Sequence, residues 1–204
     1  MRWGAVIVAA GRGTRMGAAD NKVYLPLDGR PVLAWTLEAF ERCSAVETVV
    51  IVAAASEVAR AESLTAEYGF IKVRKVVPGG LERQDSVMQG LAALDTEGVL
   101  VHDAARPLIT PEQIEACLRA AEEHGAAALA VPVKDTIKIT ENGMIVSTPE
   151  RSRLAAVQTP QAFRRQELLE AHLLARKEGA AATDDAMLLE RLGRKVACVP
   201  GHET

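Results

Sequence analysis

The chain has 204 residues, of which 49% are hydrophobic, and its formal net charge is −3. This length suits one domain with a sizeable core, and the small negative charge argues against a nucleic-acid partner, which would require a basic face. No run approaches the ~18 apolar residues of a membrane span, so no membrane association is expected. The widely spaced Cys43, Cys117 and Cys198 indicate reduced thiols and a cytoplasmic protein.

The first two thirds of the chain alternate apolar runs with segments of helical periodicity. The predicted strands are 5–10, 48–53, 71–77, 99–102 and 127–133, and the predicted helices are 31–42, 57–68, 86–94 and 111–124. This alternation predicts an α/β domain with a mainly parallel sheet and helices on both faces.

The pattern changes after residue 133. Two alternating runs, 136–140 and 144–148, flank an Asn-Gly pair, which is a strong hairpin signal. A two-stranded hairpin is marginal in water, so we expect it to pack on its own domain or on a second subunit. Helices at 164–178 and 184–192 and a strand at 196–199 complete a single domain over residues 1–204.

A glycine-rich, cationic loop follows the first predicted strand, reading Gly-Arg-Gly-Thr-Arg-Met-Gly over residues 11–17. Glycines let the backbone approach a bulky anion, and free N–H groups there bind it. The loop lacks the Gly-Lys pair of a Walker A motif, and its third glycine comes one residue late for a dinucleotide fingerprint. A nucleoside triphosphate fits better, with a solvated surface loop as the alternative.

Two later segments also carry candidate chemistry. Residues 78–86 form a glycine-rich turn that is suited to a base or phosphate edge, or is an ordinary turn into a helix. Asp103 ends a strand, where it is suited to a metal or a ribose, and Arg106 is suited to a phosphate. The alternative is that Asp103 and Arg106 simply pair, and His102 is more typical of a core histidine than of a catalyst.

Several segments, in this order, strongly resemble the 2-C-methyl-D-erythritol 4-phosphate cytidylyltransferases of isoprenoid precursor biosynthesis. They read AAGRGTRMG, NKVYLPLDGRPVL, GGLERQDSV, HDAARP, VPVKDTIK, TPQAF and ATDDA and span nearly the whole chain. HDAARP, TPQAF and the ERxxSV pattern are specific, whereas the first loop is shared with other nucleotidyltransferases. The resemblance implies a Rossmann-like nucleotidyltransferase fold with a protruding β-hairpin arm, residues 134–158, at a homodimer interface.

The resemblance also implies Mg²⁺-dependent cytidylyl transfer from CTP to 2-C-methyl-D-erythritol 4-phosphate, with release of pyrophosphate. The catalytic residues would be Arg15, Lys22 and Arg151, and the triphosphate would hold most of the Mg²⁺ coordination. The residues implied for CTP are Ala9, Ala10, Gly11, Gly13, Gly80, Ser86, Asp103 and Ala104. Those implied for the polyol phosphate are Asp103, Arg106, Thr136, Arg151, Thr159 and Thr183, some of them supplied in the family by a neighbouring subunit.

Two features depart from the family pattern. Asn21-Lys22-Val23 stands where the family usually has Pro-Lys-Gln, and Asn-Lys also resembles molybdopterin cytidylyltransferases. The family would continue beyond Thr204 with a strand that bears a lysine, so a truncated chain is expected to bind CTP but turn over poorly. A ribitol 5-phosphate cytidylyltransferase, a non-catalytic CTP-binding module and, more remotely, a Rossmann oxidoreductase stay open as alternatives.

Overall fold

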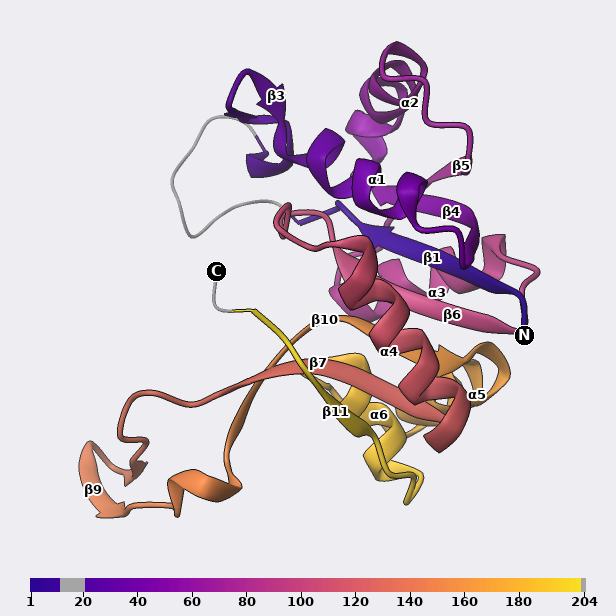
Figure 1. Cartoon of the computed structure of the whole chain (residues 1–204). Coiled ribbons are helices and arrows are strands. Elements are labelled where there is room, and N and C mark those ends of the chain that lie inside the picture. Colours follow the sequence, from indigo (N-terminus) through magenta and orange to yellow (C-terminus); the bar gives the residue numbers. More distant parts are fainter. Residues whose placement is uncertain (12–20, 203–204) are drawn as a thin grey trace.

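A seven-stranded sheet runs through the centre of the molecule (Figure 1). The computed structural model describes residues 1–11 and 21–202. The strand order is β11-β7-β10-β6-β1-β4-β5. The strands are β1 (Trp3–Val8), β4 (Val46–Ala53), β5 (Val73–Pro78), β6 (Gly98–Asp103), β7 (Ala126–Pro132), β10 (Ala155–Arg164) and β11 (Ala197–Pro200). Only β10 runs antiparallel to its neighbours among the described strands of this sheet, so the expected mainly parallel sheet is confirmed.

Helices cover both faces of the sheet. One face carries α1 (Val32–Arg42), α2 (Val58–Glu67) and α4 (Pro111–His124). The other carries α3 (Arg83–Ala93), α5 (Arg165–Glu178) and α6 (Asp185–Arg191). Strand β1 is apolar throughout because successive side chains point to opposite faces: Ala5 and Ile7 enter one core and Val6 the other. Within residues 1–11 and 21–202, no helix is long and apolar enough to cross a membrane.

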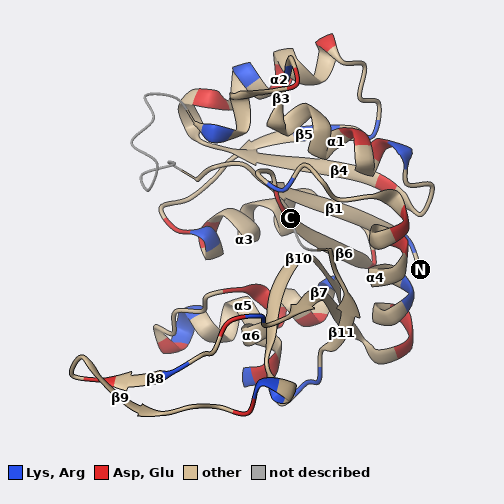
Figure 2. Cartoon of the chain, turned by 60° about the vertical axis from the view of Figure 1, so that its left-hand side comes forward, with Lys and Arg blue, Asp and Glu red and all other residues tan. Residues whose placement is uncertain are grey.

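The hairpin expected after residue 133 is present and projects from the body of the molecule as an arm (Figures 1 and 2). Its strands are β8 (Ile139–Glu141) and β9 (Met144–Ser147), shorter than the predicted runs. Asn142 and Gly143 have φ angles of 49° and 79°, which is the backbone that a two-residue hairpin turn requires. The apolar side chains of Met144 and Ile145 are 71% and 65% exposed.

The predicted helices and parallel strands are all present, with small shifts at their ends, but the sequence did not reveal β10. This strand contains Pro160, which removes a ladder donor, and its pairing with β7 shifts in register between Val157 and Gln161. The remaining described elements are short: β2 (Pro26–Leu27), β3 (Arg30–Pro31), and the 3₁₀ turns η1 (Lys22–Tyr24), η2 (Ala55–Glu57) and η3 (Arg151–Arg153).

Candidate functional site

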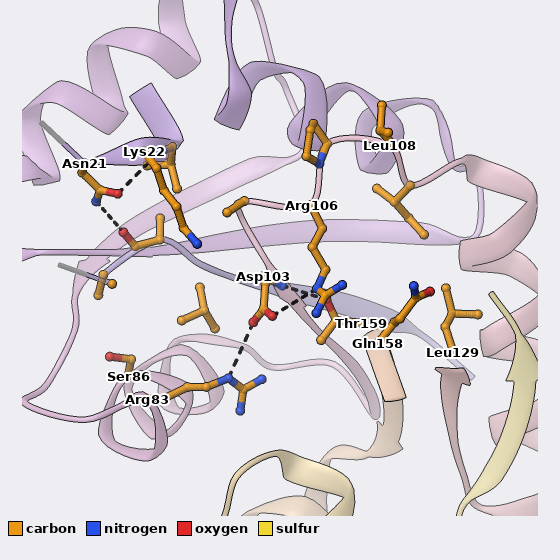
Figure 3. A pocket seen from close by; sticks show the side chains of 18 of the residues that line it. Asn21, Lys22, Arg83, Ser86, Asp103, Arg106, Leu108, Leu129, Gln158 and Thr159 are labelled. Atoms are coloured by element: carbon orange, nitrogen blue, oxygen red, sulfur yellow. Dashed lines mark hydrogen bonds and ion pairs between the residues drawn. The ribbon is translucent and has the colours of Figure 1, made fainter. Parts of the chain in front are cut away.

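A cleft of about 910 Å³ opens where β1, β5 and β6 end (Figure 3). The chain leaves β1 toward β4 and β5 on one side and returns to β6 on the other, so the strand order reverses at this point. Ligands of open α/β sheets bind outside the carboxyl ends of the strands at such a reversal. The antiparallel strand β10 adds Gln158 and Thr159 to the wall of the cleft.

Most of the described candidate residues share this cleft. Those that line it are Ala9, Ala10, Gly11, Lys22, Gly80, Ser86, Asp103, Arg106 and Thr159. Ala104 is fully buried behind the wall, whereas Thr136, Arg151 and Thr183 are exposed and are not among the lining residues. The candidates Gly13 and Arg15 lie outside the described residues.

The second glycine-rich turn packs directly against the end of β1. A Cβ atom on Gly79 would lie 2.6 Å from the Cβ of Ala10 and 2.7 Å from Ser86 Oγ, and one on Gly80 would lie 2.1 Å from the Cβ of Asp85. Ser86 Oγ accepts the N–H of Gly80 at 3.3 Å and donates to the carbonyl of Glu82 at 3.1 Å. Only glycines allow this approach, so the turn forms a narrow, backbone-lined wall of the cleft.

Lys22 is fixed on the opposite wall by the residue before it. The Asn21 side-chain amide donates to the carbonyl of Ala9 at 3.0 Å and to the carboxylate of Glu57 at 2.8 Å, and its oxygen accepts the N–H of Val23 at 3.3 Å. Val23 is itself buried. The backbone of Lys22 is therefore held on both sides while its side chain reaches into the cleft (Figure 3). The asparagine that departs from the family pattern thus ties η1 to the ends of β1 and η2.

A chain of charged groups crosses the floor of the cleft (Figure 3). Asp103 lies 3.4 Å from Arg106 Nε and 3.6 Å from Arg83 Nε, so the Asp103–Arg106 pair considered in the sequence does form. Arg83 Nη1 in turn donates to the carboxylate of Asp185 at 2.7 Å. The sequence offered no signal for this role of Arg83, because its partner stands 102 positions away.

Asp185 is fully buried and is held from its other side by His172, at 3.0 Å from Nε2. Burial alone would raise the pKa of the Asp185 carboxyl, but the hydrogen bond from His172 and the charge of Arg83 outweigh it and hold the pKa below its usual value. A buried carboxylate that stays ionised keeps Arg83 in place. Arg83 is therefore anchored from beneath and presents its remaining N–H groups to the cleft.

The candidates on the arm are arranged differently. Arg151 Nη2 lies 3.5 Å from Thr136 Oγ1, and both side chains are exposed. Thr183 is also exposed, with its hydroxyl 3.8 Å from the sulfur of Met187. Thr136 and Arg151 are thus near each other but are not part of the cleft within their own chain.

The described part of the chain contains no group of three or more histidine, cysteine or acidic side chains that could hold a metal ion. The acidic residues that line the cleft are Glu82 and Asp103. Mg²⁺ typically binds through one or two carboxylates together with substrate phosphates, keeping several waters. The donor set of the cleft fits an ion that arrives with a phosphorylated ligand.

Comparison with known proteins shows which family this chain resembles. Residues 4–204 match the family model described as 2-C-methyl-D-erythritol 4-phosphate cytidylyltransferase. Proteins of that name from Geobacter metallireducens and Pelotomaculum thermopropionicum are 47% and 51% identical to this chain; the matches cover 97% of the chain in both cases and 88% and 84% of the relatives.

Solved structures agree with the sequence relatives. The 4-diphosphocytidyl-2C-methyl-D-erythritol synthase of Anaerococcus prevotii superposes with a TM-score of 0.87 at 28% identity, over 98% of this chain and 89% of its own. The 2-C-methyl-D-erythritol 4-phosphate cytidylyltransferase of Thermus thermophilus superposes with a TM-score of 0.80 at 33% identity, over 99% of this chain and 90% of its own.

Proposed function

Because this chain belongs to the 2-C-methyl-D-erythritol 4-phosphate cytidylyltransferase family, we propose how its residues carry out that reaction. The enzyme is a nucleotidyltransferase of isoprenoid biosynthesis. It transfers a cytidylyl group from CTP to methylerythritol phosphate and releases pyrophosphate. One observation carries the assignment of roles. A glycine-containing wall, the tethered Lys22, and Arg83 and Arg106 share one cleft, which lies at the point where the strand order reverses.

CTP binds along the glycine-lined walls of the cleft in this proposal. The N–H groups of residues 9–11 and of the turn at 79–86 would approach the nucleotide closely, because the cleft is lined there by the small residues Ala9, Ala10, Gly11 and Gly80. Gly13 belongs to the same proposed site by its sequence position. Ala104 supports it from behind through its backbone rather than by direct contact.

The chemistry needs positioned charge rather than a general base. A phosphate oxygen of the acceptor, already ionised at pH 7, attacks the α-phosphorus of CTP. A new P–O bond forms as the bond to the β-phosphate breaks, and pyrophosphate leaves with that electron pair. Lys22 and Arg15 stabilise the negative charge that builds on the α-phosphate, and loss of one such group typically costs roughly 3 kcal/mol of transition-state stabilisation.

Mg²⁺ is the proposed cofactor. The triphosphate would supply most of its ligands, and Asp103 is the carboxylate of this chain best suited to add one. When bound, the ion neutralises phosphate charge. The part of this chain is to orient the phosphates between Lys22 and the 79–86 turn.

The acceptor phosphate is proposed to bind on the other side of the cleft. Arg106 would contact the phosphate group of the acceptor, whereas Asp103 and Thr159 would contact its hydroxyl groups, all from the chain that holds the CTP. Thr136 and Arg151 would reach it from the arm of a second copy, which makes the enzyme a homodimer with residues 134–158 at the interface. Thr183 remains a proposed acceptor contact on sequence grounds.

The three free cysteines support a cytoplasmic location.

Release of pyrophosphate from CTP tests the assignment. We expect release to depend on methylerythritol phosphate and on Mg²⁺, and we expect ribitol 5-phosphate to be a poor competitor at equal concentration. Efficient turnover of ribitol 5-phosphate in place of methylerythritol phosphate would overturn the assigned acceptor. Tight CTP binding without pyrophosphate release would instead favour a binding module.

A further inference from the structure

His102 is a fully buried polar side chain to which the proposed reaction gives no role. It lies at the end of β6, directly before Asp103, with its ring 5.2 Å from that of Phe40. Its Nδ1 is 3.0 Å from Thr159 Oγ1, and its Nε2 is 3.2 Å from the carbonyl oxygen of Arg106. One buried ring therefore contacts two segments that carry proposed acceptor ligands.

The hydrogen bonds define the state of this ring. The carbonyl of Arg106 can only accept, so Nε2 carries the proton. The ring is fully buried, and burial disfavours its charged form, so Nδ1 carries no proton when Nε2 carries one. Nδ1 then accepts the hydroxyl proton of Thr159, whose oxygen is free to accept the N–H of Asp103 at 3.1 Å.

Other hydrogen bonds also hold the turn that carries Arg106. The N–H of Arg106 donates to the carbonyl of Asp103 at 3.0 Å, and the N–H of Ala104 donates to that of Val8 at 3.0 Å. Thr36 Oγ1 donates to the carbonyl of Ala104 at 2.8 Å. Thr159 of β10 accepts the N–H of Asp103 at the start of the turn, and the bond from His102 ties the carbonyl at its exit to the same threonine through the ring.

We propose that His102 is a positioning residue for the acceptor phosphate: it holds Arg106 and Thr159 in one fixed relation across the boundary between β6 and β10. This role rests on the proposed function of those two residues. A rigid neutral ring has a donor on one edge for the carbonyl of Arg106 and an acceptor on the other for the hydroxyl of Thr159. Burial of the ring keeps water from competing for either hydrogen bond.

Two substitutions separate the two bonds. Asparagine places its amide near the position of Nδ1, so His102→Asn retains an acceptor for Thr159 but loses the donor to Arg106; His102→Gln does the reverse. We expect His102→Asn to raise the KM for the polyol phosphate about tenfold and His102→Gln about threefold, with the KM for CTP within about twofold of the wild type in both. His124→Asn and His124→Gln, at an exposed histidine outside the cleft, are the matched controls.

Equal KM values for the two His102 variants, or values that follow only their melting temperatures, would overturn the proposal. If His102→Asn does not fold, the pair His102→Gln and Thr159→Val remains informative. Both remove the same hydrogen bond, so their effects on kcat/KM should be clearly less than additive, and Thr159→Ser should restore activity. Additive losses would contradict the proposal. If the wild-type enzyme itself showed no turnover that depends on the acceptor, the proposed function would be wrong. That outcome is distinct from failure of the His102 proposal, which is tested only on an active wild type.

Discussion

The walls of the cleft and the β8–β9 arm meet solvent in opposite ways. Around the cleft, Ser86, His102 and Asp185 are buried, and each has a polar partner within its own chain. On the arm, apolar side chains such as Met144 and Ile145 face solvent, and the Arg151 guanidinium lies beside Thr136, which is itself exposed. An arm with exposed apolar side chains beside a preformed cleft is what the proposed homodimer requires, because such side chains are suited to a protein interface. Under the proposed roles, one chain holds most of the nucleotide site but only part of the acceptor site.

The largest effect is expected inside the cleft, at Lys22. Lys22→Ala should lower kcat about 100-fold, because the positioned charge at the α-phosphate is lost. The melting temperature should stay unchanged, since the side chain is exposed. Steady-state kinetics measure this, with Lys177→Ala on the outer side of α5 as the control. A loss of less than about tenfold would contradict the role of Lys22.

The buried anchor of Arg83 is expected to show a smaller effect. Asp185→Asn removes the charge that holds Arg83, so we expect kcat/KM to fall about tenfold and the free energy of unfolding to fall by about 2 kcal/mol. Asp184→Asn is the neighbouring control: asparagine keeps the N-cap bond to Met187 and loses only the acceptor for the Gln161 amide, so it perturbs the start of α6 without removing the partner of Arg83. Equal losses in both variants would show that Asp185 only stabilises α6.

Local sequence patterns predicted most of the secondary structure, but they did not predict the long-range contacts that hold Lys22 and Arg83 in the cleft. Apolar runs sufficed for the parallel strands and helical periodicity for every long helix, because burial of both faces of a strand, or one face of a helix, imposes these patterns locally. Strand β10 was not predicted because Pro160 interrupts the pattern of its sequence. The tether from Asn21 to Glu57 and the ion pair from Arg83 to Asp185 join positions 36 and 102 residues apart, and no local pattern encodes such contacts. The cleft residues were found mainly through the family resemblance.

The effect expected to be smallest for catalysis at neutral pH is a pH dependence of stability that arises from His102. Its pKa is about 4 in the folded chain against an ordinary value of 6.5, so the unfolded chain binds the proton more tightly. Stability is then fully present above pH 6.5 and is lost as the pH falls toward 4, by roughly 3 kcal/mol in total. Asp103 and Arg106 are the charged groups that act on this ring.

Thermal melts between pH 7 and pH 5 measure the first part of this loss, roughly 2 kcal/mol. His102→Gln should have a flatter profile than the wild type over that range, with His124→Gln following the wild type. The lowered pKa of Asp185 contributes only at lower pH, because its ordinary value is 3.8. Identical profiles for the wild type and His102→Gln would show that the ring is not held neutral by burial.

The relation between cleft and arm is tested most directly with a dimer that contains one Lys22→Ala chain and one Arg151→Ala chain, isolated through two different tags. Each variant alone should be nearly inactive. If the arm serves the cleft of the other subunit, one of the two sites in the mixed dimer combines an intact cleft with an intact arm, and about half of the wild-type rate per dimer returns. An inactive mixed dimer, or failure of the two chains to associate, would contradict the account.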